Sequence, residues 1–146
     1  MALTTLAACS KKNEATPTPA PTTGVSYTVD GAAVTSTAAN GTVQGNQVIV
    51  SGVSGTSTAN NGVLLSLPKN TGTFTITPTS DASATYLASG NSSDFYDATS
   101  GTIAVTAYSA STTAGASNIA GTFTFTGRNS AGATKTVTNG TFNVKY

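Results

Sequence analysis

Apolar and polar residues alternate over the last part of the chain, from residue 121 to residue 146. Phe123 and Phe125 are separated and flanked by threonines, so a strand over this segment has one aromatic face and one face that is a row of hydroxyl groups. Such a strand is half-buried, with its aromatic face toward a core. The segment 121–146 predicts three consecutive β-strands.

A tight turn is expected within this segment. Asn139-Gly140 separates two alternating runs, 135–138 and 141–144. Both turn residues tolerate the positive φ that a two-residue type I′ hairpin requires. In the register of such a hairpin, Val137 faces Phe142 on the core side. The pattern therefore predicts that the last two strands form a hairpin around Asn139-Gly140.

The sequence Gly-Thr-apolar-x-apolar occurs four times, starting at Gly72, Gly101, Gly121 and Gly140. The spacing between these segments is uneven, whereas a solenoid or a propeller needs a fixed period. We expect each glycine to end a turn and each threonine to begin a strand of one sheet protein.

The earlier part of the chain shows the same features in shorter runs. Residues 25–29 alternate, and Asp30-Gly31 predicts a second two-residue hairpin. The most apolar runs, 47–51 and 63–67, have consecutive apolar residues and are expected to be covered on both faces. Residues 81–100 are the least strand-like part, and we expect a long loop there.

These patterns predict an all-β fold, an antiparallel β-sandwich of about eight to ten short strands joined by hairpins. An up-and-down β-barrel of the lipocalin type is the alternative, because successive hairpins build either architecture. No window has a convincing helical period, and one domain over residues 25–146 accounts for the repeated strand pattern.

The first 24 residues differ from the rest. Leu6-Ala-Ala-Cys9 matches the lipobox that precedes the lipidated cysteine of bacterial lipoproteins, and Cys9 is the only cysteine in the chain. Residues 1–9 are expected to be the remnant of a signal peptide, because their apolar run is short and has no preceding positive charge. Residues 10–24 contain a Pro/Thr-rich stretch, which predicts an extended tether.

The amino-acid composition limits the kinds of functional site that the chain can form. The chain has no histidine, 30 threonines and only 8% charged residues, and residues 25–146 carry four basic and four acidic side chains. Nucleic-acid binding is not expected, because it needs clustered Lys and Arg. Catalytic triads, Cys–His dyads and ordinary zinc sites are excluded by the missing histidine.

Three acids remain as candidates for a site: Asp81, Asp94 and Asp97. A catalytic carboxylate pair needs burial to drive the two pKa values apart, and the expected loop is solvated, so an enzyme is not predicted. The same oxygens are candidate Ca²⁺ ligands, although the EF-hand spacing is absent. The alternative is that Asp94 and Asp97 cap turns in a soluble loop.

The aromatic residues fall into two groups. Four phenylalanines occupy alternating positions and are expected in the core: Phe74, Phe123, Phe125 and Phe142. Four other aromatic residues are candidates for ligand binding, since exposed rings stack on sugars or contact proteins: Tyr86, Phe95, Tyr96 and Tyr108. Alternation places Tyr108 on the face opposite Ile103 and Val105, and packing over an open end of the sandwich explains these rings equally well.

The segments 101–106, 119–125 and 137–144, together with the lipobox, resemble small lipoproteins of Bacteroidota that belong to families of domains of unknown function. The resemblance covers residues 25–146 loosely and is specific over 101–146. It implies an all-β domain tethered to the outer membrane and provides no catalytic or binding residues.

The sequence thus leads us to expect a lipid-anchored, non-enzymatic protein of the cell envelope, attached through Cys9, that binds an unknown protein or glycan partner or contributes to surface structure. No cofactor is expected apart from the Ca²⁺ alternative. A structural subunit that polymerises by strand addition is a second hypothesis. The periplasmic and cell-surface sides of the outer membrane both stay open.

Overall fold

The computed structural model describes residues 23–56, 59–89 and 94–146, in which ten β-strands account for most of the chain. No helix within these ranges has the length and apolarity needed to cross a membrane. The strands are β1 (Gly24–Val29), β2 (Ala32–Thr35), β3 (Ala38–Gln44), β4 (Gln47–Thr56), β5 (Ala59–Pro68), β6 (Gly72–Ile76), β7 (Ser83–Leu87), β8 (Phe95–Ser109), β9 (Asn118–Arg128) and β10 (Thr134–Lys145).

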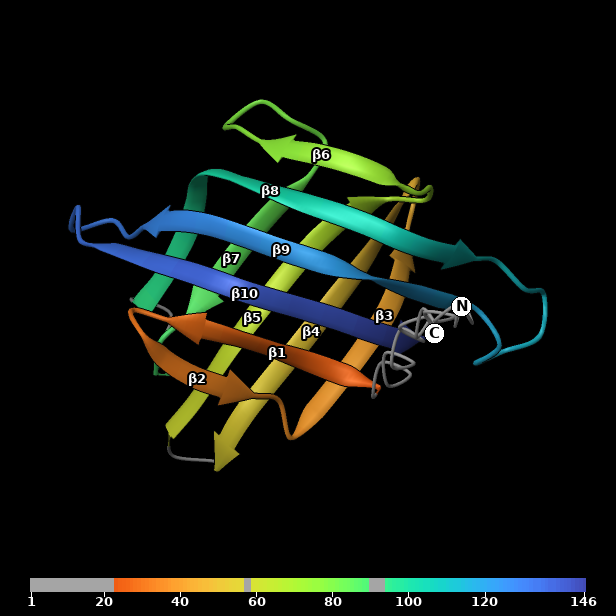
Figure 1. Ribbon diagram of the computed structural model, residues 1–146, viewed down its shortest axis with the longest axis horizontal. Helices are drawn as coiled ribbons and strands as arrows, with labels where there is room; N and C mark the ends of the chain where they lie inside the picture. The colour runs from red at the N-terminus through yellow and green to blue at the C-terminus, as the bar shows by residue number, and fades with distance from the viewer. Residues whose placement is uncertain (1–22, 57–58, 90–93) are drawn as a thin grey trace, which may run out of the picture.

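All ten strands belong to one antiparallel sheet with the order β2-β1-β10-β9-β8-β7-β5-β4-β3, and β6 pairs with β8. The sheet curls into two layers (Figure 1). The front layer contains β2, β1, β10, β9, β8 and β6, and the back layer of β7, β5, β4 and β3 runs obliquely behind it. The predicted antiparallel all-β fold is confirmed, and the curled sheet is a half-barrel that combines features of the sandwich and the barrel.

The long strand β8 joins the two layers. Its first residues, 95–97, pair with β7 of the back layer, whereas residues 101–105 pair with β6 in the front layer. The open ends of the curled sheet also approach each other: a Cβ placed on Gly52 of β4 would lie 2.5 Å from Cβ of Val25 on β1. One continuous sheet therefore encloses the core from both sides.

Alternation along the strands directs one set of side chains into this core. Residues at every second position of β1, β4 and β5 are almost completely buried, and their neighbours face solvent. The largest fully buried side chains are Phe123, Leu65, Leu67, Ile76, Ile103, Ile119, Val25, Val48, Val50, Val137 and Val144. Phe142 is also buried, and its ring centroid lies 6.3 Å from that of Phe123, as expected for inward-facing positions.

The Asp30-Gly31 hairpin is confirmed. Val29 pairs with Ala32, and the two residues between them have positive φ angles, 46° for Asp30 and 87° for Gly31. Positive φ at both central positions is the mark of a type I′ turn, whose twist matches that of the flanking strands.

The predicted hairpin at Asn139-Gly140 is wrong. β10 continues through both residues, and the Asn139-Gly140 pair lies at a β-bulge within the strand. Two residues, Thr138 and Asn139, lie opposite one residue of β9 between the pairs Val137–Phe125 and Gly140–Phe123. Asn139 has a φ of 51°. The extra residue shifts the alternation by one, so positions 137 and 142 both face the core although their separation is odd.

Three of the four Gly-Thr segments do not begin strands. Gly72 begins β6 as predicted, but Gly101, Gly121 and Gly140 lie inside β8, β9 and β10. Each of these three glycines is the cross-strand partner of a phenylalanine: the pairs are Gly101–Phe125, Gly121–Phe142 and Gly140–Phe123. A Cβ on Gly140 would lie 2.6 Å from the ring of Phe123, so the missing side chain leaves room for the ring.

Two further expectations are corrected. Residues 81–100 do not form a long loop, because they contain β7 and the first residues of β8. The runs 47–51 and 63–67 are not covered on both faces, since the side chain of Leu64 is 47% exposed and Ile49 is partly exposed. Both strands have one buried face and one outward face.

Candidate functional site

The three candidate acids do not gather into one site. Asp94 accepts a hydrogen bond from Ser89, and Asp97 accepts one from Thr85 at 2.9 Å, while Asp81 is exposed in the segment before β7. Within the described ranges, no three Asp, Glu, His or Cys side chains come close enough to hold a metal ion. Among the described residues, these three acids therefore do not form a cluster that could serve as a calcium cage.

Asp97 lines a groove of about 470 Å³ at the point where β8 passes between the layers. Arg128 is the cross-strand partner of Asp97, and the Thr85 hydroxyl donates a hydrogen bond to the Asp97 carboxylate. Ser80 and Asn129 line the same groove. Asp97 is the one member of the four candidate aromatic residues and three candidate acids that lines this groove.

Most of the candidate aromatic residues are not on the surface. Tyr86 is 4% exposed and Tyr96 is 8% exposed, because they occupy inward positions of β7 and β8. The ring of Tyr27 meets that of Tyr86 edge-on with 6.1 Å between the centroids, and the centroids of Tyr86 and Tyr96 are 6.0 Å apart. Burial, and then the neighbouring Tyr86, raises the pKa of Tyr27. Of the four candidates, only Phe95 has a largely exposed side chain, at 43%.

The prediction that Tyr108 faces away from Ile103 and Val105 is wrong. The register between β8 and β9 shifts after Val105, so that Tyr108 pairs with the fully buried Ile119. Tyr108 is partly buried against the core as a result. This bulge, like the one at Asn139, inverts the alternation that the sequence pattern predicts.

The outward face of the front layer, here called the hydroxyl face, is rich in Thr and Ser. One cross-strand row contains Thr35, Ser26, Thr141 and Thr122 on β2, β1, β10 and β9. A second row contains Thr124, Thr102 and Thr75, and a third contains Thr136, Thr126 and Ser100. No charged residue occurs in these three rows.

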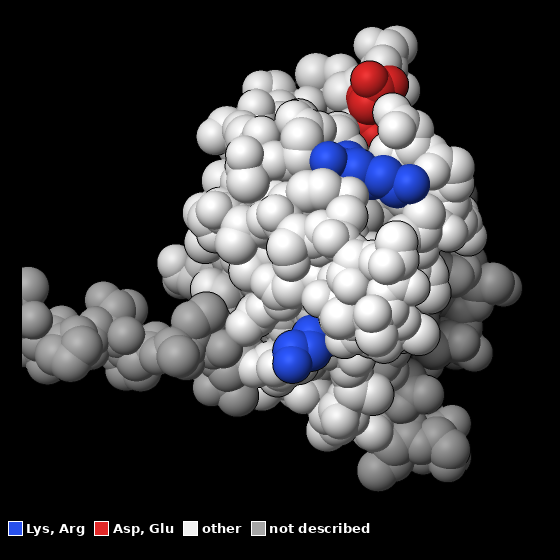
Figure 2. Space-filling view, turned by 90° about the vertical axis from the view of Figure 1, so that its right-hand side faces the viewer, with Lys and Arg blue, Asp and Glu red and all other residues white. Residues whose placement is uncertain are grey.

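The hydroxyl face is a grid whose dimensions follow from sheet geometry. Neighbouring strands are about 4.8 Å apart, and outward residues on one strand are about 7 Å apart. Asp97 and Arg128 lie at its border, two pairs beyond Ser100 and Thr126. Figure 2, which views the molecule from the right-hand side of Figure 1, shows few charged side chains among many uncharged ones.

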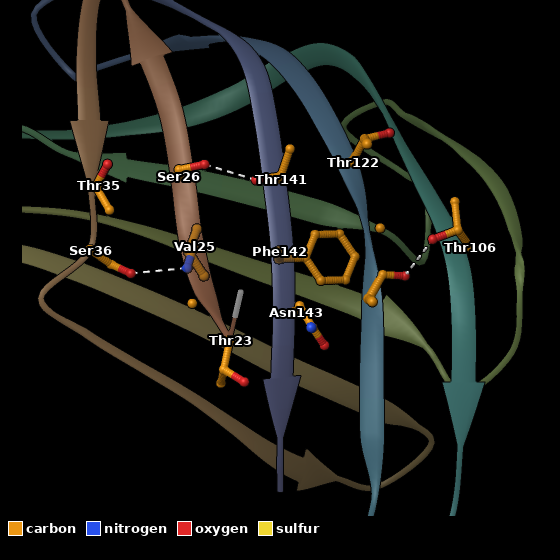
Figure 3. A pocket seen from close by; sticks show the side chains of 13 residues that line it. Thr23, Val25, Ser26, Thr35, Ser36, Thr106, Thr122, Thr141, Phe142 and Asn143 are labelled. Atoms are coloured by element: carbon orange, nitrogen blue, oxygen red, sulfur yellow. Dashed lines mark hydrogen bonds between the residues drawn. The ribbon is translucent and has the colours of Figure 1, made fainter. Parts of the chain in front are cut away.

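A groove of about 610 Å³ lies in the first row of this face (Figure 3). Ser26, Thr141, Thr122 and Thr106 lie side by side on four neighbouring strands, and Thr23, Thr35 and Ser36 line one end. Phe142 and Gly121 contribute to the floor. The lining residues include no Asp, Glu, Lys or Arg, so the groove offers hydroxyl groups, an amide and methyl groups.

Hydrogen bonds fix several of these side chains. The hydroxyls of Ser26 and Thr141 are 2.8 Å apart, and Ser36 Oγ accepts the N–H of Val25 at 2.9 Å (Figure 3). Thr106 donates to the carbonyl of Ala120 at 3.3 Å. A hydroxyl can donate one hydrogen bond and accept two, so each retains capacity toward a ligand.

An ion pair between Asp30 and Lys135 lies at the turn of the β1–β2 hairpin. Lys135 Nζ is 2.7 Å from Asp30 Oδ2, and the Thr136 N–H also binds this carboxylate. The hydrogen bond from Lys135, followed by that from Thr136, lowers the pKa of Asp30. Both side chains are partly exposed, and this pair ties β10 to the hairpin beyond the grid.

The alternation in the sequence predicts one row of hydroxyls, on the strand that contains Phe123 and Phe125, but it does not predict the groove. The sequence contains a sign of the further rows, because threonine and serine also alternate with apolar residues in 26–29, 73–76 and 100–105. Only the strand order shows that these segments are neighbours. Cys9 and the lipobox lie outside the described residues.

Comparison with known proteins places the domain in a family. The family model for the domain of unknown function DUF6252 matches residues 22–144. The chain belongs to this family. The DUF6252 domain here begins just before β1 and ends within β10, so it includes every described strand and the whole hydroxyl face. No curated protein and no solved structure matches the chain.

Proposed function

We propose that this DUF6252 domain is a non-catalytic binding module of the cell envelope that holds a neutral, hydroxyl-rich ligand, an oligosaccharide chain, on its hydroxyl face. The observation that carries this proposal is the uncharged groove of about 610 Å³ in the first row of the hydroxyl face, which continues into two further rows of Thr and Ser side chains.

The chemistry of threonine supports such a ligand. Its hydroxyl exchanges hydrogen bonds with sugar hydroxyls, and its methyl group packs against the C–H surface of a sugar ring. An ionised ligand would lose hydration here without gaining an opposite charge, which is costly. The groove therefore favours a neutral ligand, and the many small contacts along a row favour a chain over a single sugar.

This mode differs from the stacking of sugars on surface aromatic rings. Tyr86 and Tyr96 are buried in the core, and the exposed Phe95 lies in β8 away from the groove. Selectivity would come from the spacing of hydroxyl groups and from the walls at Ser36 and Thr106.

The cellular location proposed from the sequence is the outer membrane. Acylation of Cys9 would supply the anchor, and residues 10–24 the tether, so that the domain reaches a partner beyond the lipid headgroups. The groove includes Thr23 and Gly24, where the tether meets β1. A bound oligosaccharide would therefore lie next to the point where the tether joins the domain.

Titration of the isotope-labelled protein with neutral hexasaccharides, monitored by NMR, tests the proposal. Maltohexaose, cellohexaose and mannohexaose are the neutral probes, and a hexauronate of equal length is the charged one. We expect shifts at Ser26, Thr122 and Thr141 with a neutral probe. The double variant Thr122→Val, Thr141→Val keeps the shape and removes two hydroxyls, so it should weaken binding about tenfold.

Thr42→Val is the matched control, because Thr42 is an exposed threonine on the outward face of the back layer. It should leave the affinity unchanged. Binding of the hexauronate in preference to the neutral probes, or equal binding by the double variant and the control, would rule out the hydroxyl face as the site.

The second candidate function, a subunit that polymerises by strand addition, rests on the open edges of the curled sheet. Among the described strands, β2, β3 and β6 each pair with one neighbour. An incoming strand on such an edge would extend the sheet. A ladder of oligomers in size-exclusion chromatography would favour this function over the binding module.

A further inference from the structure

The groove of about 470 Å³ beside Asp97 has no part in the function proposed above. One wall belongs to the segment 77–85, which leads into and forms part of β7, and the rest consists of residues 97–99 of β8 and residues 128–129 at the end of β9. Among the described residues that line it, Asp97 and Arg128 are charged, one of each sign. We call it the charged groove.

Asp97 and Arg128 are opposite each other on neighbouring strands, a position in which opposite charges normally attract. Within the described ranges, however, the two side chains form no ion pair with each other. The Thr85 hydroxyl, on the β7 side, donates a hydrogen bond to Asp97 Oδ1 at 2.9 Å. The guanidinium of Arg128 lies over the turn after β9, where a Cβ on Gly132 would be 3.1 Å from Nη2. Each charged group is therefore held by its own neighbour, and both line the groove.

Both groups keep hydrogen-bonding capacity. An ionised carboxylate accepts about four hydrogen bonds, and a hydrogen bond from Thr85 to Asp97 Oδ1 leaves Oδ2 available. A guanidinium has five donors in a planar fork, and no described residue takes a hydrogen bond from the side chain of Arg128. This fork matches the two oxygens of a carboxylate, which it binds through two parallel hydrogen bonds.

We propose that the charged groove binds a small zwitterion, a ligand with one carboxylate and one ammonium group, as in a free amino acid or a very short peptide. The ligand's carboxylate binds Arg128, and its ammonium group binds Asp97. This inference does not depend on the oligosaccharide proposed for the hydroxyl face, because the two grooves share no lining residue.

The pair of charges selects this class of ligand. A ligand with a carboxylate alone would bind Arg128 but would be repelled by Asp97, and an amine alone would meet the opposite conflict. A ligand that carries both charges satisfies both side chains, so the groove discriminates by repulsion as well as by attraction. Pro78 and the methyl group of Thr99 add apolar surface for a small aliphatic part of the ligand.

The walls of the charged groove are fixed by hydrogen bonds within the domain. The Thr77 N–H donates to Ser80 Oγ at 2.9 Å, and the Ser80 hydroxyl donates to the carbonyl of Ala82 at 2.8 Å. On the other side, Asn129 Oδ1 accepts the N–H of Ala133 at 2.8 Å, which closes the turn under Arg128. Walls that are already ordered lower the entropy cost of binding a small ligand.

NMR titration of the isotope-labelled full chain, produced without its lipid, tests the proposal at low ionic strength, where surface charges are least screened. The probes are L-alanine, N-acetyl-L-alanine, which lacks the ammonium group, and L-alanine amide, which lacks the carboxylate. We expect saturable shifts at Thr85, Ala98 and Asn129 with L-alanine, and affinities about tenfold or more lower with the other two. L-alanyl-L-alanine is the fourth probe, and its affinity relative to L-alanine distinguishes a short peptide from a free amino acid.

Two variants remove one charge each at nearly constant size. Asp97→Asn and Arg128→Gln should each weaken binding of the tighter zwitterion about tenfold or more. Asp94→Asn and Lys145→Gln are the matched controls, because they make the same changes in charge at residues that do not line the groove. Both controls should bind like the original protein.

The proposal is overturned if neither zwitterion gives saturable shifts at the groove, or if a probe with a single charge binds as tightly as L-alanine. Equal affinity in the groove variants and their controls also overturns it. The two grooves are distinguished in the same spectra, since sugar binding is followed at Ser26 and Thr122, so either proposal can fail while the other stands.

Discussion

Gly121→Ala is expected to destabilise the domain more than any exposed glycine substitution. The added Cβ would overlap the carbonyl oxygen of Ala104 on β8 and would lie 2.7 Å from Cζ of Phe142. The ring of Phe142 can tilt, but the carbonyl belongs to the backbone ladder between β8 and β9. Overpacking alone costs about 1 to 3 kcal/mol. A lost ladder hydrogen bond adds about 1 kcal/mol, so we expect a total of about 2 to 4 kcal/mol.

Urea denaturation followed by far-UV circular dichroism measures this loss, since the chain has no tryptophan to report unfolding. Gly115→Ala is the control: Gly115 has a φ of 72° and no atom lies within 4 Å of the position that an added Cβ would take, so only backbone strain of about 1 to 2 kcal/mol is expected. If Gly121→Ala lowers the free energy of unfolding no more than Gly115→Ala does, the close approach of β8 to β9 is not a constraint and the reasoning fails.

Three further predictions concern other parts of the chain. Phe142→Ala should cost about 3 to 5 kcal/mol in urea melts, whereas the double variant Asp94→Asn, Asp97→Asn should stay within about 0.5 kcal/mol; a larger loss in the double variant would contradict the assignment of stability to the core. Burial raises the pKa of Tyr146 to about 12, with Tyr108 beside it adding to the shift. Its neutral form is thus favoured in the folded state, so this stabilisation is complete below pH about 10 and is lost as pH rises toward about 12. Tyr146→Phe should reduce the loss, measured by melts across this range, and an identical pH dependence in the variant would refute it. Cys9→Ala, expressed behind a complete signal peptide, should move the protein from the detergent phase to the aqueous phase in a partition assay, and unchanged partition would exclude the lipid anchor.

The sequence was sufficient for the fold class and for most of the core, but two similar turn signals had different outcomes. Asp30-Gly31 forms a hairpin, and Asn139-Gly140 forms a bulge. A hairpin and a bulge both bring positions 137 and 142 to the same face, so alternation does not distinguish them. The two outcomes are distinguished by the neighbouring strand, β9. Because β9 pairs with β10 continuously from residue 128 to residue 118, Asn139-Gly140 lies inside one strand and not between two.

The site was harder to predict for a related reason. Residues 83–87 form a strand in which Ala84 and Tyr86 are buried, but small residues such as alanine give little hydrophobic signal and the segment resembles a loop. The hydroxyl groups of Ser26, Thr141 and Thr122 belong to segments far apart in the chain. Their meeting in one row depends on strand order, which no local pattern contains.

The three glycine–phenylalanine pairs restrict the register of strands β8, β9 and β10. Alternation forbids a slip by one residue, because every side chain would move to the opposite face, but it permits a slip by two. In β10 such a slip would move Phe142 from Gly121 to the position of Ile119 or Phe123, where a side chain already fills the space. The glycines thus exclude the shifts that hydrophobic patterning alone would tolerate, and they give a threonine-rich sheet with little charge a single alignment.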